Sequence, residues 1–402
     1  MRLPKISEKK FVALIFIFNL ILRLFILSSP SRAYFDEKIY YLNAVRDILA
    51  GKADPNFQHP PLAKELMAFG IKFFGDNPWG WRSFQAILAS VAVVCVYFLA
   101  KRLFNNRAIA SITAFLMTIE FSWFVLSRLA IPEMFMISFF TFSLFFLIKF
   151  YKERDNLSLV FGSVFFGLAV ACKWAPLIFL PIIIYVFLAK FKLSKIAKLQ
   201  IFVIAVLIVV ASYLAPFFLM PKHYTIGDVI NSHVKALNFH LFEEKKLVQK
   251  TPTFATSAVF WPVDVYFINL EKAGNSSIAS VVFFYNPAIL WTGLILSFFI
   301  LKHFLKSRKV DTRLFLVSSF LIFWLPWFVS PRDTYPYYWA IGIPFAAILV
   351  AEFLVRNLKK YKLEVGAFLL AGGILFGLFY PIMTNIPVKA WYLGLLTGIG
   401  FK

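Results

Sequence analysis

Two adjacent carboxylates, Asp36 and Glu37, are the residues of this sequence whose types and spacing best suit catalysis. They follow an apolar run and open a polar stretch, residues 34–64, that ends with HPPLAK, which contains His59 and Lys64. Acidic residues at the mouth of a membrane helix are costly unless they are hydrated, paired or functional. A solvated helix start would also carry acids in its first turn, and the prolines would then only punctuate a loop. We predict that the two acids are catalytic.

Further charged residues recur near the same ends of the apolar runs. A cavity lined by carboxylates and cations at one membrane face suits a reaction on a phosphate-bearing lipid, because cations hold the phosphate and a carboxylate accepts a proton. Any one of these cations could instead be an interfacial residue whose stem lies along apolar surface. The predicted substrate-binding residues are His59, Lys64, Arg82, Arg128, Glu133, Lys173, Trp174 and Arg332.

The composition defines the class of protein that must position these residues. The 402-residue chain is 60% hydrophobic and has a mean hydropathy of +0.76, whereas soluble domains are roughly 45–50% apolar. We predict an all-α, polytopic membrane protein, in one domain spanning residues 1–402, with long external loops at 29–82 and 220–285. A 19-residue window predicts about eleven spans, at 11–28, 83–100, 108–126, 132–149, 158–172, 175–189, 200–219, 286–301, 314–329, 336–355 and 365–385.

The basic residues are divided unevenly between the two sides of this arrangement. With the N-terminus in the cytoplasm, the tail and every short inside loop hold at least three Lys or Arg, whereas the short outside loops hold one each. This is the positive-inside pattern, and it explains most of the net charge of +22 without nucleic acid. We expect a multi-pass protein of the cell membrane whose active site faces outside.

The sequence offers no metal site or cofactor motif. His223, His233 and His240 in the second long loop are spaced by ten and seven residues, which fits no compact metal-ligand pattern; that loop is expected to be a partly ordered lid or an acceptor surface. Cys95 and Cys172 fall within apolar runs and are expected to serve packing. Because no soluble nucleotide-binding half is visible, an activated sugar would arrive as a lipid phosphate.

Eight segments of the sequence together carry a resemblance to a known family. They are FDE at 35–37, HPPLAK at 59–64, WRSFQAILASVAVVCVYFLAKRLFNNR at 81–107, SRLAIPEMFM at 127–136, GLAVACKWAPL at 167–177, FWP at 260–262, YNPAILWTG at 285–293 and LPWFVSPRDTYPYYWAIGIPF at 325–345. With these segments the sequence resembles the protein O-mannosyltransferase family, membrane glycosyltransferases of the GT-C class that use a polyprenyl-phosphate mannose. The resemblance covers residues 10 to 355. The sequence is similar to the shorter prokaryotic members, since the second long loop leaves no room for the large lumenal domain of eukaryotic members.

The resemblance implies roles and partners. Asp36 would be the base toward the acceptor hydroxyl, and Glu133 stands where the family usually has an Asp, which keeps the charge but lengthens the reach. The segment around Arg332 would lie against the donor, where a planar guanidinium suits phosphate oxygens; a pair with Asp333 is the alternative. The implied partners are a polyprenyl-phosphate sugar donor, a protein or peptide acceptor and membrane lipids, and the implied reaction is an inverting transfer of mannose to a Ser or Thr hydroxyl.

Two other functions are compatible with the pattern. A related GT-C enzyme could place a pentose or aminopentose on a lipid or glycan, although HPPL followed by Lys64 and the Lys173-Trp174 pair favour the protein-mannosylating branch. A secondary transporter would also be polytopic, but it would be expected to show inverted repeats and a midplane site, and no repeat is apparent in this sequence.

Overall fold

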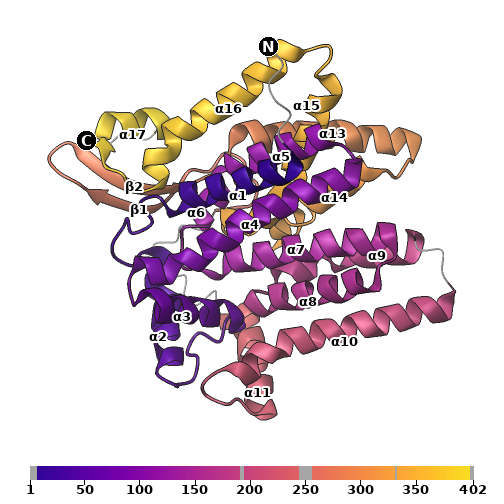
Figure 1. Ribbon diagram of the computed structural model, residues 1–402. Helices are drawn as coiled ribbons and strands as arrows, with labels where there is room; N and C mark the ends of the chain where they lie inside the picture. Colours follow the sequence, from indigo (N-terminus) through magenta and orange to yellow (C-terminus); the bar gives the residue numbers. More distant parts are fainter. Residues whose placement is uncertain (1–6, 191–193, 244–255, 331–332, 399–402) are drawn as a thin grey trace.

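The computed structural model describes residues 7–190, 194–243, 256–330 and 333–398. In this part the chain is mostly helical, with one small sheet at one end (Figure 1). The helices are α1 (Glu8–Leu24), η1 (Glu37–Tyr41), α2 (Leu42–Leu49), α3 (Leu62–Phe74), α4 (Pro78–Phe104), α5 (Arg107–Thr118), α6 (Phe121–Leu126), α7 (Pro132–Glu153), α8 (Asn156–Cys172), η2 (Ala175–Phe179), α9 (Leu180–Lys190), α10 (Lys195–Leu219), α11 (Ile226–Asn238), η3 (Phe239–Glu243), α13 (Pro287–Ser307), α14 (Thr312–Leu321), η4 (Leu325–Val329), η5 (Pro336–Gly342), α15 (Ile343–Asn357), α16 (Lys362–Met383) and α17 (Ala390–Thr397).

Each of the eleven predicted spans falls on helical segments of the structure, so the prediction of a multi-pass membrane protein is confirmed. By length and composition, seven of the described helical stretches can cross a membrane. The remaining predicted spans fall on shorter helices, among them 107–118, 156–172 and 175–189. The seven stretches are Pro78–Phe104, Pro132–Glu153, Lys195–Leu219, Pro287–Ser307, Thr312–Val329, Pro336–Asn357 and Lys362–Met383.

The prediction that the fold is all-α was wrong in one respect. Strands β1 (Tyr266–Lys272) and β2 (Ser277–Phe283) form an antiparallel pair, and β3 (Val388–Lys389) adds to β2. Both long strands carry β-branched or aromatic residues, and the turn between them contains Gly274 at φ 132°. These are features of a hairpin, so the second long loop and the segment after α16 are joined by a sheet rather than by helices.

Helices α4, α7 and α15 form the interior of the bundle. Helix α4 packs against α1, α3, α5 and α7, α7 packs against α8, and α15 packs against α5, α13 and α14. In the most apolar window of each, 61%, 67% and 83% of the residues are buried, whereas the figure for α10 is 11%. The interior is therefore built by protein contacts, and the outer helices present apolar side chains to lipid.

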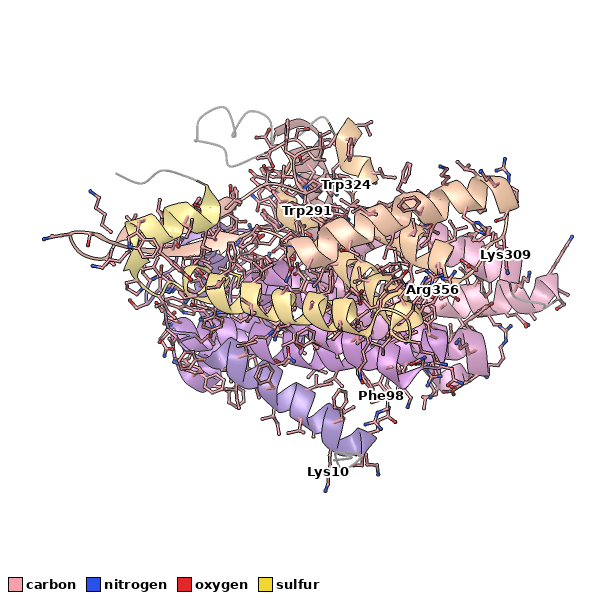
Figure 2. All side chains as sticks on the ribbon, turned by 90° about the horizontal axis from the view of Figure 1, so that it is seen from above. Lys10, Phe98, Trp291, Lys309, Trp324 and Arg356 are labelled. Carbon is pink, nitrogen blue, oxygen red and sulfur yellow. The ribbon has the colours of Figure 1, made fainter. Side chains whose placement is uncertain are left out.

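The candidate residues lie where helices begin or end at one end of the bundle, which we call the site end. Asn77 caps α4 through hydrogen bonds from the Trp79 and Gly80 amides, and Pro132 opens α7 with its fixed φ. Helix α8 ends just before Lys173, and η5 begins at Pro336. Lys309 and Arg356 lie toward the opposite end, away from α17 (Figure 2).

Candidate active site

Asp36 lies in the connection between α1 and η1, half-buried at the site end. Its Oδ2 is 3.4 Å from the hydroxyl of Tyr337, which donates to it across 301 positions of sequence. The preceding Phe35 has a positive φ of 52° and packs edge-on against the rings of Tyr337 and Tyr266. The carboxylate is thus held by Tyr337 at the beginning of the α15 span, and the residue before it packs against Tyr266 of strand β1.

Burial is the main cause of the raised pKa of the Asp36 carboxyl group. Together with the negative charge of Glu133, it raises the pKa of Asp36 to about 7, against the opposing effects of Lys173 and of the Tyr337 hydrogen bond. A carboxyl group whose pKa is near 7 can accept a proton near neutral pH and release it again, which is the property of an efficient general base.

A second carboxylate and a cation lie beside the same tyrosine. The Lys173 Nζ donates to Glu133 Oε1 at 2.6 Å, and it lies 5.7 Å and 4.8 Å from the ring centroids of Tyr337 and Tyr338. The other oxygen, Glu133 Oε2, is buried and accepts no hydrogen bond from the residues that the structure describes. An unused buried acceptor is costly, so this oxygen is suited to a hydroxyl of a bound substrate.

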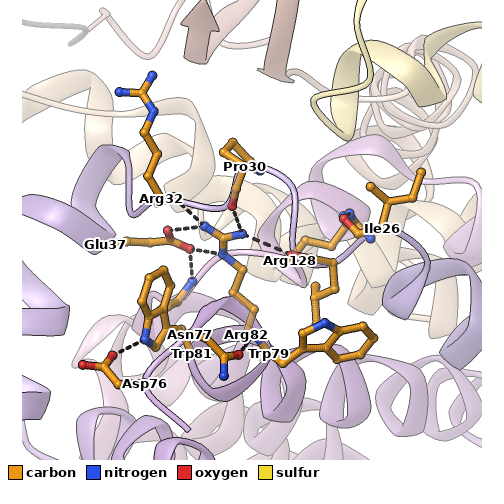
Figure 3. Close-up of polar contacts among 12 residues, drawn as sticks. Ile26, Pro30, Arg32, Glu37, Asp76, Asn77, Trp79, Trp81, Arg82 and Arg128 are labelled. Carbon is orange, nitrogen blue, oxygen red and sulfur yellow. Dashed lines mark hydrogen bonds and ion pairs between the residues drawn. The ribbon is translucent and has the colours of Figure 1, made fainter. Parts of the chain in front are cut away.

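Glu37 is engaged by the protein itself (Figure 3). It accepts two hydrogen bonds of 2.8 Å from Arg82 and one of 2.7 Å from the backbone amide of Ala130, and both charged side chains are fully buried. The other donors of the Arg82 guanidinium bind the backbone carbonyls of Leu27, Pro30 and Arg32. The pair therefore fixes the segment that carries Asp36.

Two further predicted substrate-binding cations are also committed to protein groups. Arg128 donates to three backbone carbonyls at the end of α1, from residues 23, 25 and 26. Lys64 is fully buried; it pairs with Asp54 and donates to the carbonyl oxygens of Asn56 and His59. Lys64, Arg82 and Arg128 were predicted to contact substrate; in the structure their donors bind protein groups, which sequence alone could not show, and they position the site-end connections.

His59 and Trp174 line a small, open pocket next to Lys173, with an enclosed volume of only about 30 Å³. The His59 ring is stacked between Tyr41 and His240, with centroid distances of 6.3 Å and 5.7 Å. Tyr213 and Phe217 from α10, Tyr224 from the connection after it and His233 from α11 also line the pocket. This wall is aromatic and open on one side, which suits a ligand with both apolar and polar parts.

Two residues need separate mention, Arg332 and Tyr337. Arg332, a predicted substrate-binding residue, lies outside the residues that the structure describes. Tyr337 was not predicted, although its aromatic-rich surroundings, TYPYYW, could have signalled it. Among the described residues no three or more His, Cys, Asp or Glu side chains are grouped so as to hold a metal ion, and Cys95 and Cys172 are free thiols.

The fold and the placement of the site define the class: a multi-pass membrane protein with the fold of the GT-C glycosyltransferases. The structure is similar to that of the Saccharomyces cerevisiae protein O-mannosyltransferase Pmt1-Pmt2 complex bound to the sugar donor, with a TM-score of 0.79, 12% identity and coverage of 99% of this chain and 93% of that one. It is also similar to ArnT from Cupriavidus metallidurans bound to undecaprenyl phosphate, with a TM-score of 0.62, 14% identity and coverage of 97% and 77%. At such identities the likeness shows the fold alone.

The sequence comparisons find a resemblance to one family over part of the chain. Residues 58–217 match the family model described as dolichyl-phosphate-mannose-protein mannosyltransferase. The polyprenol-phosphate-mannose–protein mannosyltransferase of Corynebacterium glutamicum is 28% identical over 205 residues, which are 42% of this chain and 39% of that relative. The enzyme of the same name from Mycolicibacterium smegmatis is 31% identical over 121 residues, 28% of this chain and 23% of that relative. The predicted resemblance to the protein O-mannosyltransferase family is therefore confirmed, over less than half the length of these relatives.

Proposed function

We propose that the protein transfers mannose or a similar hexose from a polyprenyl-phosphate donor to a Ser or Thr hydroxyl of a protein, at the external face of the cell membrane. The observation that carries the proposal is the Asp36 carboxylate, held by Tyr337 next to the Lys173–Glu133 pair at the end of a membrane bundle. The names of the relatives supply the donor and acceptor classes.

In this reaction the acceptor oxygen attacks the anomeric carbon of the sugar as the bond from that carbon to the phosphate oxygen breaks. Asp36 accepts the proton of the acceptor hydroxyl, and the bonding electron pair leaves with the polyprenyl phosphate. Attack opposite the leaving group inverts the anomeric centre. A phosphate needs no proton to leave, only positive charge that stabilises it.

The remaining residues divide into substrate contacts and supports. Lys173 and Arg332 are proposed to bind the phosphate, and the unused Glu133 Oε2 is proposed to accept a hydrogen bond from a sugar hydroxyl. His59 and Trp174 would form the wall along which the donor or the acceptor lies. Glu37, with its Arg82 partner, holds the base in place.

A second candidate function is transfer of a sugar to a lipid or glycan. The observation that favours it is the likeness to ArnT over 97% of this chain. One experiment separates the two candidates: purified protein is incubated with radiolabelled polyprenyl-phosphate mannose and either a Ser/Thr peptide or extracted membrane lipid, and the products are identified by mass spectrometry. Label on the peptide hydroxyl supports the proposal, and label on lipid alone replaces it.

We expect the pH dependence to report the Asp36 carboxyl. The base must be unprotonated, so kcat/KM should rise about tenfold per pH unit up to the pKa of about 7 and level off above it. Because the Lys173 cation lowers that pKa, Lys173→Gln should move the midpoint to higher pH in addition to slowing the reaction, and Tyr337→Phe should move it in the same direction. Tyr338→Phe is the matched control. A rate that falls as pH rises from 5 to 7 would remove Asp36 as the base.

The proposed orientation gives a labelling prediction. In protein whose Cys95 and Cys172 are replaced by alanine, Ala50→Cys at the site end should react with an impermeant maleimide added to intact cells. Lys195→Cys, at the beginning of α10 and equally exposed, should react only after the cells are broken. Labelling of position 195 in intact cells would reverse the orientation.

A further inference from the structure

Helix α11 follows a membrane helix almost without interruption. Helix α10 ends at Leu219, and α11 begins at Ile226 after a connection of six residues, 220–225. In Figure 1, α11 turns away from the direction of α10 at the site end. Such a short connection keeps α11 at the level of the membrane boundary, because six extended residues span at most about 20 Å.

The residues of α11 form three faces around its axis, since successive residues of an α-helix are about 100° apart. The first face is packed on the protein and contains the buried residues Val229 and Ala236 together with His233. The second is exposed and polar: Asn231, Lys235 and Asn238. The third, which we call the apolar face, is also exposed and consists of Ile226, Ile230, Val234 and Leu237, at 71%, 58%, 49% and 49% exposure.

A helix with one face on protein, one polar and one apolar suits the boundary between bilayer and water. Interfacial helices bury an apolar face roughly 5–10 Å into the headgroup region while their charged side remains in water. The apolar face continues the surface of α10, whose last residues, Phe218 and Leu219, are 44% and 78% exposed. Lys222 and Lys235 add cations that are attracted to anionic headgroups.

We propose that the apolar face of α11 is seated in the lipid bilayer surface at the site end. The partner is the lipid itself, because the apolar face is continuous with the lipid-facing surface of α10 and the cations flank it. This seating is independent of the reaction that the site carries out.

The packed face of α11, which adjoins the apolar face, forms part of the wall of the pocket beside Lys173. His233 contacts the Tyr213 hydroxyl through Nε2, and its ring is stacked 6.0 Å from that of Trp174. His240, just beyond α11, donates a hydrogen bond of 2.9 Å from Nε2 to the carbonyl oxygen of Gln58. Bilayer contact on the apolar face of α11 therefore supports the pocket wall formed by the adjoining packed face.

The test is site-specific quenching in vesicles. Single cysteines are introduced at Ile230 and Val234 on the apolar face, and at Asn231 and Lys235 on the polar face as matched controls, in protein whose Cys95 and Cys172 are replaced by alanine. Each is labelled with bimane and reconstituted in vesicles of phosphatidylcholine and phosphatidylglycerol. With lipids brominated on the acyl chain, we expect about twofold or more stronger quenching at 230 and 234 than at 231 and 235. With aqueous iodide we expect the reverse order.

Two results would overturn the seating. Strong iodide quenching at 230 and 234, equal to that at 231 and 235, would place the apolar face in water. Shielding of 230 and 234 from both quenchers would mean that protein, such as a second copy of the chain, covers it. Because all four positions are exposed, the substitutions leave the packed face intact, and an unchanged thermal unfolding temperature of each labelled variant verifies the fold.

Discussion

Asp36→Asn is expected to lower turnover by roughly two to four orders of magnitude, the usual contribution of a positioned general base. The amide has nearly the size of the carboxylate and can still receive the Tyr337 hydrogen bond, but it cannot accept the proton of the acceptor hydroxyl. Binding of the donor should be nearly unchanged, because its phosphate is proposed to contact cations elsewhere in the site. Single-turnover transfer and equilibrium binding of polyprenyl phosphate, measured on the same purified protein, separate the two effects.

Asp47→Asn is the matched control for this substitution. Asp47 lies on α2 in the same part of the chain, and its ion pair with Lys52 is exposed to solvent. Its loss should change turnover by less than about twofold, since exposed pairs contribute little. If the Asp36→Asn protein kept near-normal turnover, or lost donor binding in proportion to activity, the base would have to be sought elsewhere.

Glu37→Gln is expected to destabilise the protein by about 3–5 kcal/mol, the usual result of removing one member of a buried ion pair. The guanidinium of Arg82 would then keep its charge in a fully buried position without a neighbouring anion. The loss would be measured as the decrease in free energy of unfolding in detergent micelles, with activity recorded in parallel. We expect activity to fall as well, because the segment that holds Asp36 loses its support.

The exposed Asp47–Lys52 pair provides the matched control for this substitution, through Lys52→Gln. Its partners are 70% and 36% exposed, so the free energy of unfolding should change by less than about 1 kcal/mol. A second comparison is the double variant Glu37→Gln/Arg82→Met, in which no buried charge is left. This double variant should be more stable than Glu37→Gln alone; equal stability would mean that the buried charge is not the source of the loss.

The sequence was sufficient to predict the helical spans, because a membrane helix is specified by a continuous apolar run of about 20 residues. The acidic pair and the positions of Glu133, Lys173 and Trp174 were likewise placed at one end of the bundle by counting spans. The hairpin at 266–283 was missed because its polar turn and short strands lie within a loop that hydropathy treats as one polar stretch. Local signals for a strand are much weaker than those for a membrane helix.

The roles of the cations could not be predicted from sequence, for a physical reason. Arg82, Arg128 and Lys64 were expected to contact substrate because each is a charge near an apolar run, and a charge there needs a partner. The partners turned out to be backbone carbonyls and two acids, Glu37 for Arg82 and Asp54 for Lys64. The carbonyls that bind Arg82 and Arg128 come from segments far along the chain, and no periodicity encodes any of these contacts. Tyr337 was missed for the same reason, since its contact with Asp36 joins residues 301 positions apart.

The order of synthesis determines when the contacts of the connection that carries Asp36 can form. Its supports Arg82, Arg128 and Ala130 are translated within the first third of the chain, and Tyr337 only near the end. A nascent chain that has inserted α1 through α7 already holds this connection in place, but its carboxylate has no hydroxyl partner until the α15 span arrives. The site proposed for catalysis is therefore assembled only after Tyr337 has been made, and a shorter chain in the membrane carries the support of Asp36 without its hydroxyl partner.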